Sequence, residues 1–60
     1  MVVYVNDKPI HLLPGMKVRN ALIQAGLLGL LKENRRVYDE WGNEMGLDGA
    51  LYENMKMFVR

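Results

Sequence analysis

The chain has 60 residues, half of them hydrophobic, and a formal net charge of +1 at pH 7. It contains no cysteine, serine or threonine, which excludes disulfides, thiolate metal ligands, cysteine-bound iron–sulfur clusters and every hydroxyl or thiol nucleophile except tyrosine. The longest apolar run, residues 21–31, is shorter than the roughly 20 residues of a membrane span, and Met1 leads straight into a strand pattern. We therefore expect one soluble, cytoplasmic domain over residues 1–60, without a membrane partner.

The first segment of the chain predicts an antiparallel hairpin. Residues 2–6 are β-branched and aromatic, which favours a strand. Asn6-Asp7-Lys8 has the composition of a turn. Pro9 lacks a backbone N–H, so we expect it to begin the second strand or to face a sheet edge.

A helix is predicted after the Pro14-Gly15 corner, over residues 17–26. Apolar residues recur at i, i+3, i+4 and i+7, at Val18, Ala21, Leu22 and Ala25. Gly26 followed by an apolar residue is typical of a helix end. A helix running on to Glu33 would turn Leu27, Leu30 and Leu31 away from this stripe, so we expect a break near Gly26 and a short second turn or helix around Leu28–Glu33.

The rest of the chain predicts shorter strands. Residues 37–39 and 44–47 flank a turn at residues 40–43, residues 48–54 form a loop, and residues 55–59 alternate as a final strand. The predicted class is α+β, a mixed four- to five-stranded sheet with one main helix across one face. The first and last strands would lie side by side, parallel, in the middle of the sheet. The predicted core is Val3, Val5, Ile10, Leu12, Val18, Leu22, Ala25, Leu47, Leu51, Met57 and Val59.

Three stretches, residues 5–10, 13–18 and 51–59, resemble the ubiquitin-like β-grasp superfamily, in particular small sulfur carriers and ferredoxin-type domains. The resemblance implies a β-grasp fold and spans nearly the whole chain. The functional signatures differ, since the chain stops at Arg60 without a Gly-Gly tail and has no cluster cysteines. Met16-Lys17 occupies the position where the family usually has a Thr or Ser helix cap, and a lysine there opposes the helix dipole.

Candidate chemistry is sparse. His11 is the single histidine, and no carboxylate stands at a recognisable spacing from it. Asp39, Glu40 and Glu44 match no calcium-loop spacing, so we expect solvated hairpin carboxylates. The sequence predicts neither an enzyme nor a bound metal or cofactor.

Two features favour binding. Trp41 stands at the predicted hairpin tip, either exposed as an anchor for a partner or folded back over the sheet. Lys32, Arg35 and Arg36 follow the leucine-rich stretch, which either forms an apolar patch with a basic rim or closes the open end of the sheet. The predicted partner-binding residues are Leu28, Leu31, Lys32, Arg35, Arg36 and Trp41.

Three functions remain open at this level. The first is a non-catalytic adaptor that binds a protein partner, or a second copy, through a sheet edge or the leucine-rich segment. The second is a weak RNA-binding module, in which Tyr4, Tyr38, Tyr52, Trp41 and Phe58 are the aromatic residues that could stack on bases. The third is a tail-less relative of the sulfur carriers.

Overall fold

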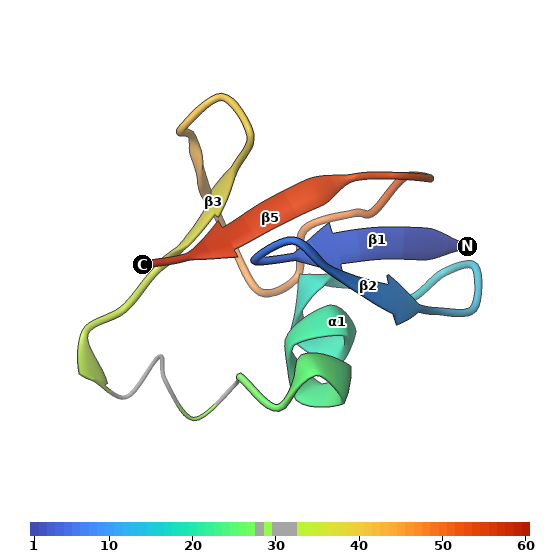
Figure 1. Ribbon diagram of the computed structural model, residues 1–60, viewed down its shortest axis with the longest axis horizontal. Coiled ribbons are helices and arrows are strands. Elements are labelled where there is room, and N and C mark those ends of the chain that lie inside the picture. Colours follow the sequence, from blue (N-terminus) through green and yellow to red (C-terminus); the bar gives the residue numbers. More distant parts are fainter. Residues whose placement is uncertain (28, 30–32) are drawn as a thin grey trace.

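The computed structural model describes residues 1–27, 29 and 33–60, and within these residues the chain forms one mixed five-stranded sheet with one α-helix on one face (Figure 1). The strands are β1 (Val2–Val5), β2 (Lys8–His11), β3 (Val37–Asp39), β4 (Glu44–Met45) and β5 (Lys56–Val59), and the helix is α1 (Val18–Ala25). The strand order is β2-β1-β5-β3-β4. Only the central β1–β5 pair is parallel, which confirms the predicted arrangement of the first and last strands.

The first hairpin closes through a two-residue turn. Asn6 and Asp7 both have positive φ, 51° and 68°, and Val5 pairs directly with Lys8. Such a turn matches the right-handed twist of the strands, so Lys8 belongs to β2 and not to the turn as predicted. Asn6 also joins β5 to this hairpin, because its Oδ1 accepts the Val59 N–H at 2.9 Å.

The helix ends as the sequence predicts. Gly26 adopts a left-handed conformation with φ 74°. The N–H groups of Gly26 and Leu27 donate to the carbonyls of Ile23 and Leu22, at 3.1 and 2.9 Å. These bonds satisfy carbonyls that a helix end otherwise leaves unpaired. Much of the predicted second helical turn at Leu28–Glu33 lies outside the described residues.

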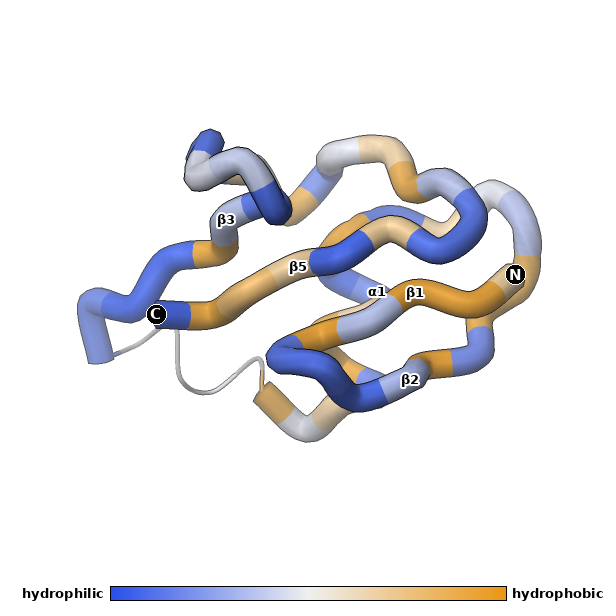
Figure 2. Tube along the Cα trace, turned by 45° about the horizontal axis from the view of Figure 1, so that its top comes forward, coloured by the Kyte–Doolittle hydropathy of each residue, from blue (hydrophilic) through white to orange (hydrophobic). Residues whose placement is uncertain are grey.

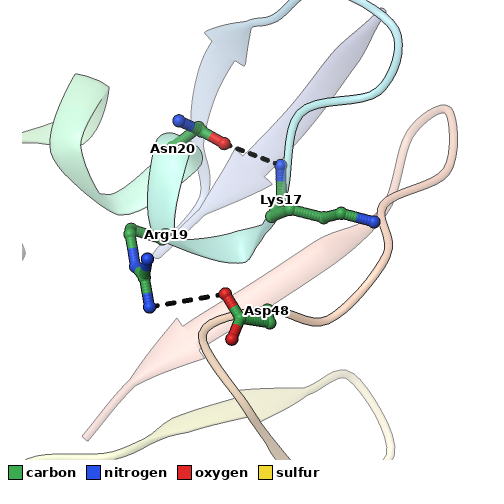
Figure 3. Close-up of polar contacts among 4 residues, drawn as sticks. All are labelled: Lys17, Arg19, Asn20 and Asp48. Atoms are coloured by element: carbon green, nitrogen blue, oxygen red, sulfur yellow. Dashed lines mark hydrogen bonds and ion pairs between the residues drawn. The ribbon is translucent and has the colours of Figure 1, made fainter.

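The helix start is stabilised by a distant loop instead of a side-chain cap. The N–H groups of Val18 and Arg19 donate to the carbonyls of Gly49 and Leu47, at 3.1 and 2.9 Å. Asn20 Oδ1 accepts the Lys17 N–H at 2.9 Å, and Figure 3 shows the Lys17 ammonium extending away from the first helical turn. Because these N–H groups already have acceptors, the missing Thr or Ser cap leaves none of them without a hydrogen bond.

The core lies between α1 and the sheet. Hydrophobic residues concentrate along β1 and β5, while the β1–β2 turn is polar (Figure 2). The buried residues are Val3, Val5, Ile10, Leu12, Val18, Ala21, Leu22, Val37, Met55, Met57 and Val59. The predicted core residues Ala25, Leu47 and Leu51 are only partly buried against this cluster.

Val37 and Met55 are buried although they were not predicted to be. Val37 pairs with Val59 across β3 and β5, and the Met55 carbonyl accepts the Tyr4 N–H at 2.8 Å. Both residues therefore lie against the sheet centre because of contacts with distant segments. Among the described residues, no helix has the length and apolar character needed to cross a bilayer.

Candidate functional site

The β3–β4 hairpin forms one outer edge of the sheet. β4 pairs with β3 through Val37–Met45 and Tyr38–Glu44, and the order of strands leaves its other side without a strand among the described residues. β4 ends at Met45, so the predicted strand over residues 44–47 is too long. Leu47 instead turns away to accept the Arg19 N–H at the helix start.

The tip of this hairpin is organised by one carboxylate. Asp39 Oδ1 accepts the backbone N–H groups of Trp41 and Asn43 at 2.9 and 2.8 Å, and Oδ2 accepts the Asn43 side-chain amide at 3.3 Å. These hydrogen bonds, chiefly the one from the Asn43 backbone, hold the pKa of Asp39 below its ordinary value. Gly42 completes the turn with φ 83°.

Trp41 extends from this tip into solvent. Its relative exposure is 71%, which decides between the two predicted placements: the indole is available and does not cover the sheet. A large aromatic held on a tight turn is an efficient contact residue, because little conformational freedom is lost when it is buried by a partner.

A shallow groove of about 240 Å³ lies at the other end of the hairpin. Its lining includes the buried Val37 and the partly buried Met45 and Leu47, with Arg35, Arg36, Glu44 and Gly46. Arg36 Nη1 contacts Glu44 Oε2 at 3.0 Å, and Arg35 Nε lies 3.7 Å from Glu33 Oε2. The groove thus combines apolar and basic side chains beside a free strand edge.

The structure brings together part of the predicted binding set. Arg35 and Arg36 line the groove, and Trp41 lies at the tip of the same hairpin. An antiparallel strand rises about 3.4 Å per residue, so the three steps from Arg36 to Asp39 separate groove and tip by about 10 Å. Leu28, Leu31 and Lys32 lie outside the described residues.

The sheet face opposite α1 brings together three of the five aromatic residues named as candidates for base stacking, which the sequence did not place on one face. Tyr4, Lys56, Phe58 and Tyr38 occupy strand positions that alternate with buried ones, and Tyr38 pairs directly with Phe58. The period of two, with Val3 and Val5 buried on β1, would have placed Tyr4 on this face. Only the order of the strands in the sheet places the three rings together.

The remaining candidates stay apart. His11 is exposed on β2, at the opposite edge from Asp39 and Glu44. Among the described residues, no group of three or more His, Cys, Asp or Glu side chains is arranged to hold a metal ion. Asp39 and Glu44 form hydrogen bonds inside the hairpin.

Comparison with known proteins gave no match to a family model, to a curated protein or to a solved structure. The functional inference therefore depends on the geometry of the β4 edge, the groove and the sheet face.

Proposed function

We propose that this chain is a non-catalytic β-grasp module that binds a protein partner along β4. The order β2-β1-β5-β3-β4, with a parallel central pair and a helix on one face, supports the β-grasp assignment that the sequence resemblance implied. A fold of this kind hosts many functions, so the binding role is inferred from the site.

The observation that carries the proposal is the open edge of β4 beside the groove. Asp39 and Asn43 form a hydrogen-bonded pair, so in an antiparallel ladder the Glu44 N–H and carbonyl point away from β3. An extended peptide can pair with these groups as an added strand. Side chains of a peptide bound in this way would reach the groove at one end of β4 and Trp41 at the other.

The chemistry of the groove specifies the peptide. Val37, Met45 and Leu47 favour an apolar side chain. Arg35 and Arg36 together exceed Glu44 in the lining by one positive charge, which favours a carboxylate next to it. We therefore expect the partner to present an extended segment that contains an apolar residue, an acidic residue and a residue that packs on the indole.

Selection from a displayed library of random peptides tests this proposal with the intact protein. We expect enrichment of segments with adjacent apolar and acidic residues. Arg35→Glu and Trp41→Ala should each weaken the selected peptide about tenfold or more, as hot-spot residues do. Lys8→Glu, an equally exposed charge reversal on the β2 edge, serves as the matched control and should leave binding unchanged. Equal losses in all three variants, or no enrichment, would refute binding along β4.

A further inference from the structure

Three aromatic side chains lie on neighbouring strands of the sheet face opposite α1. Tyr4 is on β1, Phe58 on β5 and Tyr38 on β3, and Figure 1 shows these strands side by side in the sheet. Tyr38 and Phe58 are cross-strand partners, and Tyr4 pairs with Lys56, two residues before Phe58. All three residues are partly buried. We call these residues, with Lys56, Arg60 and Arg36, the aromatic face.

The charge on this face is mainly positive. Lys56 and Arg60 are exposed on and after β5, and Arg36 exchanges backbone hydrogen bonds with Arg60 at 2.8 and 2.9 Å. The Arg60 guanidinium lies over the Phe58 ring, 5.6 Å from its centre, and a base that stacks on this side of the ring would take its place. One carboxylate, Glu44, contacts Arg36, so the three cations of the face exceed it by two charges.

A second carboxylate borders the face at the start of β1. Glu53 Oε2 accepts the Val2 N–H at 2.6 Å and keeps its negative charge, so with Glu53 included the three cations exceed the carboxylates by one. The aromatic face therefore combines flat rings, which stack on bases, with cations, which contact phosphates. An acidic peptide would use the cations but would leave the row of rings without matching planar groups.

We propose that the aromatic face binds single-stranded RNA. The bases stack on Phe58, Tyr4 and Tyr38, while the phosphates contact Lys56 and Arg60. A duplex keeps its bases stacked on one another, so it cannot offer them to these rings. The hydroxyls of Tyr4 and Tyr38 are hydrogen-bonding groups suited to the ribose 2′-hydroxyl, which favours RNA over DNA. This site lies on the face of the sheet and meets the peptide site proposed along β4 at Arg36, which belongs to both.

Fluorescence anisotropy with labelled octauridine at low salt tests the proposal. We expect saturable binding, weaker with a matched DNA oligonucleotide and absent with a duplex. Affinity should fall with added salt, with a slope of log K against log salt of about −1.4 for two phosphate contacts. Phe58→Leu and Tyr4→Leu keep an apolar side chain without the ring and should each weaken binding about tenfold.

Two variants serve as matched controls. Trp41→Leu removes an exposed aromatic side chain that lies outside the aromatic face. Lys8→Glu reverses a charge on the β2 edge and is the control for Lys56→Glu, which reverses a charge on the face. We expect the first two to leave the RNA affinity unchanged and Lys56→Glu to lower it at least fivefold. An equal loss with Trp41→Leu, or equal affinity for DNA, would overturn the assignment.

Backbone amide shifts of the unmodified protein give a readout that does not depend on variants. Octauridine should shift the amides of Tyr4, Lys56 and Phe58, while shifts confined to residues 44–47 would contradict the proposed face. The two binding proposals fail separately: Arg35→Glu should weaken peptide binding and spare RNA binding, and Phe58→Leu should weaken RNA binding and spare peptide binding. Absence of RNA binding at high micromolar protein would refute this proposal and leave the peptide site unaffected.

Discussion

The two hairpins form opposite edges of one sheet and are stabilised in different ways. β1 and β2 have four residues each, meet at a two-residue turn and place Val3, Val5 and Ile10 in the core. β3 and β4 have three and two residues, and the Asp39 carboxylate organises their turn. Three core residues anchor the first hairpin, whereas the second buries Val37 and has its exposed tip held by hydrogen bonds.

The two edges also differ in what they offer to another chain. β2 carries Lys8 and Pro9, and Pro9 pairs with Tyr4 at a position where its nitrogen faces outward, with no N–H to donate. β4 has neither residue type. Edge protection thus occurs at one end of the sheet, and the exposed binding features occur at the other.

The largest effect is expected where α1 covers the first hairpin. Leu22 is fully buried, so Leu22→Ala should lower the free energy of unfolding by about 2–5 kcal/mol, measured by urea denaturation. Ile23, the next residue along the helix, is 52% exposed, and Ile23→Ala should change the free energy of unfolding by less than about 0.5 kcal/mol. Similar losses in the two variants would mean that α1 does not pack as described.

A smaller effect is expected at the loop that links the second hairpin to the helix start. A Cβ at Gly49 would lie 3.1 Å from the Gly46 carbonyl oxygen and 3.3 Å from Val18 Cγ2, so Gly49→Ala should destabilise the fold by about 1 kcal/mol. A Cβ at Gly46 would meet no atom within 4 Å. Gly46→Ala is therefore the control, and a loss as large as that of Gly49→Ala would exclude the close approach as the cause.

Removing the protection of the first edge tests the difference between the edges directly. Pro9→Val restores an outward N–H on β2 and should change the stability of the monomer by no more than about 0.5 kcal/mol. It should, however, increase self-association at high protein concentration, measured by sedimentation velocity. An unchanged sedimentation coefficient across concentrations would show that Pro9 does not protect this edge.

The smallest effect is local and depends on pH. Because the hydrogen bonds lower the folded-state pKa of Asp39, the carboxylate stabilises the hairpin above the unfolded-state pKa and loses this contribution as the pH falls through the folded-state pKa. The amide shifts of Trp41 and Asn43 should therefore titrate together below the model-compound value of 3.8. Asp39→Asn should abolish that titration, whereas a midpoint above 3.8 in the unmodified protein would contradict the described turn.

Local patterns were sufficient to predict the elements with strong periodicity. Strand alternation near Val3, the helical stripe from Val18 and the stop at Gly26 all depend on residues close together in the sequence. The parallel central pair was also predicted, because hairpin, helix and final strand leave few ways to bury their apolar faces together. For the binding set, the chain order placed Arg35, Arg36 and Trp41 on one hairpin, and the structure shows the groove and the exposed indole.

Tertiary structure decided the features that depend on distant partners. The carbonyls of Leu47 and Gly49 complete the helix start, Met55 is buried beside β1, and three aromatic rings meet on one face of the sheet. None of these follows from spacing along the chain, because each depends on which strands become neighbours and in which register. By itself, the sequence determined the order and type of most elements, because these depend on local periodicity, whereas strand pairing determined which side chains share a surface.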